Sequence, residues 1–155
     1  MATGFTRPQT QAELLGAETH THFADAAPLL VANEASLDAL NRELASQEES
    51  PVPMNRFRPN ITIRGPGAFQ EHELAALAGP EYRLRMCHPC QRCKVTTIDQ
   101  DSAEKHPHWQ PYKTLATLNP MPGTKRAPAF GHNAIIEKGA GARVSLGDRL
   151  ITTEV

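Results

Sequence analysis

The sequence has few aromatic residues and no long apolar segment. Phe, Trp and Tyr make up only 5% of the 155 residues, so a folded core must be built mainly from aliphatic side chains. No apolar run approaches the roughly 18–20 residues that a membrane-spanning helix needs. The start, MATGFTRPQTQAELLG, lacks the apolar region of a secretory signal and carries little sign of an organelle-targeting segment. We therefore expect no membrane span.

The sequence also has almost no net charge and few cysteines. The formal net charge is −1, which gives no reason to expect a nucleic-acid partner. The chain has three cysteines, an odd number that argues against a secreted disulfide framework. We expect a single domain in a reducing compartment, with a cytoplasmic location.

Thirteen prolines and ten glycines divide the chain into short elements. Apolar and β-branched runs predict strands, and their ranges are 28–32, 60–63, 81–87, 94–99, 132–138 and 142–155, the last interrupted at 147–148. Five or more strands without β-α-β alternation predict a mainly β fold with peripheral helices, as a partly closed barrel or folded sheet.

Helices are expected to be few. Leu37, Leu40 and Leu44 recur at helical spacing and predict an amphipathic helix over 36–47, with Ser36 as its cap. Shorter helical turns are expected in two further ranges, 71–79 and 113–118. Proline-rich 51–60 should be an extended loop, and 99–131 a long surface excursion.

All three cysteines lie in one stretch, CHPCQRC at 87–93, and the residues alone leave four interpretations open. The cysteines could be small buried hydrophobic side chains. They could bind structural zinc with a distant histidine such as His132, His108 or His106 as the fourth ligand. An iron–sulfur cluster is the third interpretation, although the expected fourth cysteine and following proline are missing.

The fourth interpretation is a single reactive or metal-binding thiolate. Nearby cations lower the pKa of a thiol and so favour its nucleophilic, metal-ligating form. Arg92 and Lys94 flank Cys93, and Arg85 precedes Cys87 by two residues. In a strand, however, Arg92 and Lys94 would lie on the face opposite Cys93, so the cations would have to be brought to the thiol partly by folding.

A second stretch with distinctive chemistry is MNRFRPN at 54–60. In an extended segment Arg56 and Arg58 would point the same way, and their planar guanidinium groups suit a phosphate or carboxylate. Asn55 and Asn60 could add neutral hydrogen bonds. The alternative is a solvated charged loop that buries Phe57.

Other polar clusters carry weaker signals. Two histidine pairs invite a metal interpretation, but their loop positions favour exposed polar side chains, namely His20/His22 and His106/His108. The acidic residues within 99–104 are expected to form a solvated turn. Trp109 and Tyr112 could form part of a substrate wall or could anchor a proline-rich loop.

Four segments, in order, resemble the MOSC domain, namely PLLVANEASLDALNREL, PMNRFRPNITIRG, CHPCQRCKVTTID and FGHNAIIEKGAGARVSLGD. This molybdenum-cofactor domain occurs in mitochondrial amidoxime-reducing components, in YcbX-like proteins and at the C-terminus of molybdenum cofactor sulfurases. The resemblance covers roughly residues 22–155, so we assign 1–21 as an N-terminal extension. It implies a MOSC-type, partly closed β-barrel.

The resemblance also implies a cofactor, the molybdenum cofactor (Mo-molybdopterin), and a set of residues that hold it. Cys93 matches the cysteine that ligates molybdenum and is the implied catalytic residue; a soft thiolate suits that metal. Cys87, His88 and Cys90 are given structural roles by default. The implied cofactor-binding residues are Asn55, Arg56, Arg58, Asn60, Arg92, Thr96 and Thr97.

The implied function is a molybdenum-dependent reductase of N-oxygenated compounds such as amidoximes or hydroxylamines. An external donor of the cytochrome b5 or flavin/ferredoxin type would supply electrons. The alternative is a non-catalytic cofactor or sulfur carrier, like the C-terminal domain of the sulfurase, whose pyridoxal-phosphate domain is the source of the family's association with pyridoxal phosphate binding. The larger relatives carry an N-terminal β-rich domain, so a separate chain could supply that part here, and mitochondrial association is compatible with the resemblance.

Overall fold

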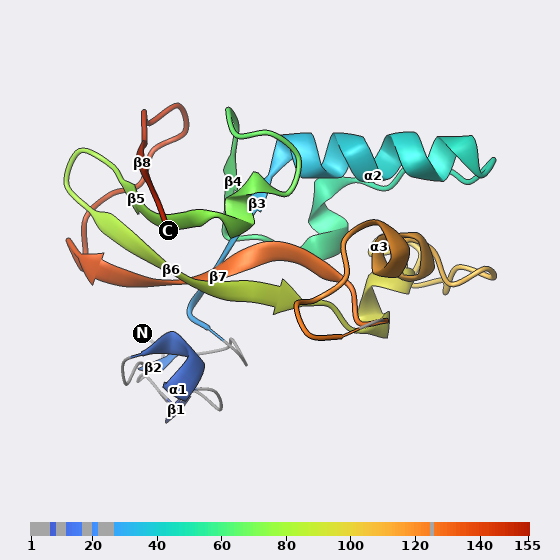
Figure 1. The fold of residues 1–155 in the computed structure, drawn as a ribbon, viewed down its shortest axis with the longest axis horizontal. Coiled ribbons are helices and arrows are strands. Elements are labelled where there is room, and N and C mark those ends of the chain that lie inside the picture. Colours follow the sequence, from blue (N-terminus) through green and yellow to red (C-terminus); the bar gives the residue numbers. More distant parts are fainter. Residues whose placement is uncertain (1–6, 9–11, 17–19, 22–26, 125) are drawn as a thin grey trace.

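A curved sheet carries the fold. The computed structural model describes residues 7–8, 12–16, 20–21, 27–124 and 126–155. Its main sheet has six strands in the order β4-β3-β7-β6-β5-β8 and bends into a half-barrel with short helices at its periphery (Figure 1). The expected mainly β fold, a partly closed barrel with peripheral helices, is thereby confirmed.

Eight strands, three α-helices and three 3₁₀ turns are found among the described residues. The strands are β1 (Arg7–Pro8), β2 (His20–Thr21), β3 (Leu29–Asn33), β4 (Ile61–Ile63), β5 (Leu74–Ala78), β6 (Arg83–Gln91), β7 (Ala129–Lys138) and β8 (Ile151–Glu154). The α-helices are α1 (Ala12–Leu15), α2 (Glu34–Ser46) and α3 (Tyr112–Leu118). Three 3₁₀ turns complete the set, at Met54–Phe57, Gln70–His72 and Lys94–Thr97.

The sheet mixes parallel and antiparallel pairing. β3 and β4 are parallel, whereas the other neighbours in the main sheet are antiparallel. Parallel neighbours need a long crossover, and here α2 supplies it. The expectation that β-α-β alternation is absent was therefore wrong for this one unit, because 60–63 pairs beside the strand that precedes the helix.

The core on the α2 side is aliphatic around one aromatic pair. Leu40 and Leu44 of α2 are fully buried together with Leu115 of α3. The rings of Phe57 and Phe130 stack there with their centroids 3.7 Å apart. The buried Phe57 ring packs on Phe130 of β7 and so fixes the end of the 54–57 turn against that strand.

Two predicted elements have a different structure. The 71–79 range was expected to be helical, but Leu74–Ala78 is strand β5 between β6 and β8; pairing on both edges overrides the helix propensity of Ala and Leu. The 94–99 range was expected to be a strand, but Lys94–Thr97 is a 3₁₀ turn. The Thr96 and Thr97 hydroxyls donate to carbonyls three residues back, which stabilises the turn.

Three predicted boundaries also shift. The 142–155 strand is reduced to β8, and the extended 51–60 loop contains the Met54–Phe57 turn. Asn33, not Ser36, caps α2, since its side chain accepts a hydrogen bond from the Ala35 N–H. Ser36 is buried instead and donates to Glu71. The short helix near 113–118 is confirmed as α3.

Helix α1 and the β1–β2 pair lie on the side of the main sheet opposite α2 (Figure 1). The Arg85 guanidinium donates to the Leu15 carbonyl of α1 across 2.7 Å. The predicted boundary between 21 and 22 is still a prediction, because residues 22–26, with His22, lie outside the described residues. Within the described part of the chain, no helix has the length and apolar character needed to cross a membrane.

Candidate functional site

The end of β6 delivers Cys93 to the surface. β6 stays paired with β7 as far as Gln91, and the Arg92 N–H then donates to the Pro128 carbonyl at 2.8 Å. The backbone N–H and the hydroxyl of Thr96 both donate to the Cys93 carbonyl, at 3.2 and 3.0 Å. Cys93 is therefore exposed, and hydrogen bonds fix the backbone both before it, at Arg92, and after it, at Thr96.

The arginine segment is a tight turn. Met54–Phe57 is a 3₁₀ turn, and Arg58 follows it in the left-handed region with φ of 54°. Arg56 is buried, whereas Arg58 is exposed. The expectation of an extended segment was wrong here, so the side-by-side orientation inferred from extended geometry no longer supports Arg56 and Arg58 as a pair.

Two contacts join this turn to the segment that carries Cys93. The Arg92 guanidinium donates to the Phe57 carbonyl at 2.9 Å, across 35 residues of sequence. The Arg56 guanidinium donates to Asp99 at 2.6 Å, across 43 residues. The two stretches that the sequence singled out therefore lie in direct contact.

Basic residues stand on both sides of Cys93 in the sequence. Lys94 follows it directly, and Arg92 precedes it and also donates to the Cys90 sulfur at 3.0 Å. The Lys94 and Lys105 ammonium groups lie 4.6 and 3.6 Å from the centroid of the Trp109 ring. An anionic ligand at Cys93 would be electrostatically favoured in these surroundings.

Asp99 supplies the matching negative charge for Arg56. Donation from the Ser102 and Asp101 backbone N–H groups is the main cause that lowers the pKa of Asp99, and Arg56 lowers this pKa further. The carboxylate therefore stays ionised at neutral pH, and Arg56 is compensated by it. The predicted solvated turn at 99–104 is present, with an ion-pairing role added.

The three cysteines have three different environments. Cys87 packs beside Leu15 and Ile135, and burial raises the pKa of its thiol, which makes it a poor nucleophile. Cys90 is half-buried against Arg92. Among the described residues the cysteines belong to no group of three potential ligand atoms within 4.8 Å, so neither a zinc site nor an iron–sulfur cluster built on all three thiols is supported.

The remaining predicted site residues have local structural partners. The Asn60 side chain accepts from the Leu30 N–H at 2.7 Å, which ties the start of β4 to β3. Asn55 has an exposed side chain, and its carbonyl accepts from the Arg58 N–H. Thr96 and Thr97 are buried and use their hydroxyl protons within the turn. A cofactor-binding role for each of them is still a prediction.

Sequence reasoning missed the links that hold the site together. Asp99 was not identified as the partner of Arg56, because a separation of 43 residues leaves no local pattern. The Phe57 carbonyl could not be predicted as the partner of Arg92 either, since every residue has a backbone acceptor and the sequence does not show which one is used. Trp109 was noted, but the stacking of two lysines on its ring was not expected.

This half-barrel, with an exposed cysteine beside an arginine-bearing turn, is the architecture of a MOSC domain. The MOSC family model matches residues 18–151, and the chain belongs to this family, which is associated with the molybdenum cofactor. The human mitochondrial amidoxime-reducing component 1 is 30% identical over 136 residues, covering 84% of this chain and 39% of the relative.

Two further curated relatives are similar at the same level. The mouse component 1 and the human component 2 are each 32% identical over 127 residues. Each alignment covers 79% of this chain and 36% of the relative. The chain thus spans less than half the length of these curated relatives.

The residues present fit the cofactor that the family implies. The Nε atoms of Arg56 and Arg92 are buried with no hydrogen-bond partner, so both guanidinium groups retain unused donor capacity. Cys93 offers an accessible soft donor, Lys94 is an exposed cation next to it in sequence, and exposed Arg58 directly follows Phe57, whose carbonyl accepts from Arg92. An exposed thiol whose two neighbouring residues are an arginine and a lysine is suited to a metal that carries an anionic, phosphorylated ligand.

Proposed function

We propose that this chain binds the molybdenum cofactor through Cys93 and the Arg92–Phe57 junction, and reduces N-oxygenated compounds. The observation that carries the proposal is the hydrogen bond from Arg92 to the Phe57 carbonyl. It unites the cysteine-bearing segment with the arginine-bearing turn, in a family whose amidoxime-reducing members are about 30% identical to this chain.

Each residue has a defined task in this proposal. Cys93 provides the thiolate ligand, and the Thr96 hydroxyl fixes the backbone on which that thiolate stands. Arg58 and Arg92 hold the cofactor's anionic groups, while Arg56 is neutralised by Asp99 and orients the turn. When bound, the cofactor supplies two-electron transfer to the N–O bond of the substrate.

The reaction balances with an external donor of the cytochrome b5 or flavin/ferredoxin type. An amidoxime takes up two electrons and two protons, its N–O bond breaks, and an amidine and water leave. The exposed Cys93 admits both substrate and donor to the same surface. Trp109, beside Lys94, is the side chain available to form a wall of the substrate site.

The test is cofactor loading followed by turnover. The chain is produced in a host that makes the molybdenum cofactor, purified, and analysed for molybdenum and pterin. An amidoxime is then supplied with a chemically reduced viologen as donor. We expect stoichiometric cofactor and amidine formation. Cofactor without turnover would favour the non-catalytic carrier, and absence of both molybdenum and pterin would contradict the proposal.

The compartment and a partner chain belong to the same proposal. The curated relatives are named as mitochondrial proteins, and the cytoplasmic location expected from the sequence is still a prediction. A separate chain that completes the cofactor pocket, as expected from the family resemblance, is a further part of the proposal.

A further inference from the structure

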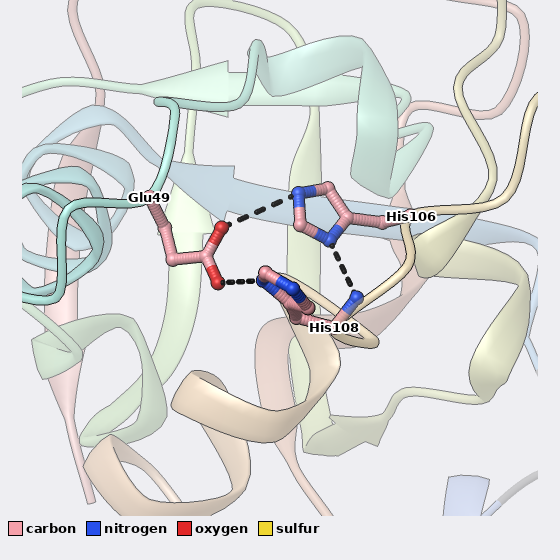
Figure 2. Close-up of side chains that lie close together, drawn as sticks. All are labelled: Glu49, His106 and His108. Carbon is pink, nitrogen blue, oxygen red and sulfur yellow. Dashed lines mark hydrogen bonds and ion pairs between the residues drawn. The ribbon is translucent and has the colours of Figure 1, made fainter.

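Glu49, His106 and His108 form a polar cluster that takes no part in the contacts around Cys93. Glu49 lies just after α2, and the two histidines flank Pro107 in the loop before α3. Figure 2 shows one carboxylate oxygen of Glu49 directed at each imidazole ring. The distances are 2.7 Å to Nδ1 of His108 and 3.5 Å to Nε2 of His106. The expectation of exposed side chains holds for His108 but not for half-buried His106.

The geometry points to a binding site for a divalent transition-metal ion of the zinc class, formed by Glu49, His106 and His108. The three residues each offer one ligand atom, and these atoms lie within 4.8 Å of one another. Two imidazoles and one carboxylate are a typical donor set for zinc. This trio is the one such group found among the described residues.

The spacing of the ligand atoms suits a tetrahedral ion. With metal–ligand bonds near 2.0–2.1 Å, neighbouring ligand atoms of a tetrahedral site lie roughly 3.3 Å apart. The 3.5 Å distance from one Glu49 oxygen to His106 is close to this value, whereas the contact to His108 is made by the other oxygen, so ligation through a single oxygen requires the carboxylate or the His108 ring to turn. The 2.7 Å contact to His108 must open by roughly half an ångström, and the His108 side chain, 69% exposed, is free to move that far.

Ion binding also requires a change at His106. Nδ1 of His106 accepts a hydrogen bond from the His108 backbone N–H at 3.2 Å, so the neutral ring carries its proton on Nε2, facing Glu49. Ligation through Nε2 moves that proton to Nδ1 and releases the long backbone contact. Lys105, which precedes His106, has its ammonium group over the Trp109 ring.

A bound ion would join two parts of the helical side of the domain. The end of α2 and the start of α3 are already linked by the hydrogen bond from Thr114 to Gln47 at 2.8 Å. Three protein ligands leave the fourth position of a tetrahedral ion to water or a small anion. Glu49 and His108 both line a surface cavity of about 920 Å³ that could admit such a ligand.

The test is Zn²⁺ and Co²⁺ titration of the full chain after chelator treatment. Because thiols also bind these ions, the titration is done in the Cys93→Ala chain as well as the wild type, and Co²⁺ absorption distinguishes thiolate ligation from nitrogen and oxygen ligation. We expect one equivalent of Co²⁺ without a thiolate charge-transfer band in the Cys93→Ala chain. In the same Cys93→Ala background this signal should be weakened by Glu49→Gln and lost in His106→Gln/His108→Gln.

The neighbouring glutamate provides the matched control. Glu48→Gln removes an exposed carboxylate one residue away and should leave the Zn²⁺ affinity unchanged, whereas Glu49→Gln should weaken it at least about tenfold, the loss expected for a metal ligand or its close support. Circular dichroism checks that each variant is folded. Equal affinity in Glu49→Gln and Glu48→Gln, or no ion bound by the Cys93→Ala chain, would overturn the inference.

Discussion

Arg92 is the residue that connects the two halves of the candidate site. Its guanidinium donates to the Phe57 carbonyl and to the Cys90 sulfur, and it lies 5.9 Å from the centroid of the Phe57 ring. A planar group with several fixed donors can serve all these partners at once, whereas a lysine ammonium cannot. The geometry around Cys93 therefore depends on this side chain being arginine.

We predict that Arg92→Lys lowers the free energy of unfolding by about 1–3 kcal/mol, because hydrogen bonds from a charged donor are lost. Urea denaturation measures the change. Arg83→Lys is the matched control, since the ion pair of Arg83 with Glu137 is partly exposed and such pairs contribute at most about 1 kcal/mol. Equal effects of the two substitutions would show that Arg92 has no special structural role.

His132, which is buried, and His72, which is half-buried, form a pair of neutral imidazoles. Their Nδ1 atoms lie 3.3 Å apart, and Nε2 of His72 accepts from the Asn119 amide at 3.0 Å. Burial lowers the pKa of His72 to about 4. Burial, followed by the nearby His72 and His88, lowers the pKa of His132 to about 3. Protonation of either ring would leave two donors facing each other.

Because both histidines have lowered pKa values, we predict that the free energy of unfolding falls at acidic pH. Below the ordinary pKa of 6.5 the unfolded chain binds protons that the folded chain does not, so stability falls as the pH drops from 6.5 towards 4 and 3. Each histidine contributes a slope of up to about 1.4 kcal/mol per pH unit. Glu71 opposes this, because burial raises its pKa.

His72→Gln isolates this effect. Urea unfolding between pH 4.5 and 7 should give a slope against pH that is shallower than the wild-type slope by up to about 1.4 kcal/mol per pH unit. His108→Gln is the control, since the His108 side chain is largely exposed. A wild-type slope retained in His72→Gln would contradict the account.

The N-terminus of α2 is fixed by a network of side-chain hydrogen bonds. Asn33 caps it by accepting from the Ala35 N–H and also donates to the Gly67 carbonyl at 2.7 Å. Behind the cap, buried Glu71 accepts from the Ser36 hydroxyl at 2.7 Å. This network fixes the loop between β4 and β5 to the first turn of the helix.

Asn33→Ala should lower the free energy of unfolding by about 2–3 kcal/mol, the sum of a lost helix cap and an additional buried hydrogen bond. Chemical denaturation of the chain without cofactor measures it. Asn55→Ala, at an exposed asparagine, should change stability by less than about 0.5 kcal/mol. A loss as small in Asn33→Ala as in Asn55→Ala would exclude the network as a stabilising feature.

The sequence predicted elements where local pattern and tertiary context agree. Leu37, Leu40 and Leu44 placed α2 correctly because the same face is buried. The LAALA run of β5 was predicted as helix, because no local signal reveals that strands pair with it on both sides. The strand predicted at 94–99 failed for a local reason, since two threonine hydroxyls close a turn instead.

At the scale of the whole molecule, the sequence indicated which segments matter but not how they meet. Family-level motifs singled out Cys93 and the 54–60 segment, and the fold brings these regions together through Arg92 and Asp99. Long-range partners and backbone acceptors have no signature in one sequence, so Asp99, the Phe57 carbonyl and the Glu49 cluster emerged only from the folded chain. Which residues contact the cofactor is still a prediction.

Molybdenum and pterin content tests the central claim most directly. We would measure both in the chain purified from a cofactor-producing host, as the wild type, Cys93→Ala and Cys87→Ala, with circular dichroism to verify folding. The account predicts about one molybdenum per chain in the wild type and in Cys87→Ala, and almost none in Cys93→Ala. Equal molybdenum in Cys93→Ala and Cys87→Ala, or none in the folded wild type, would contradict it.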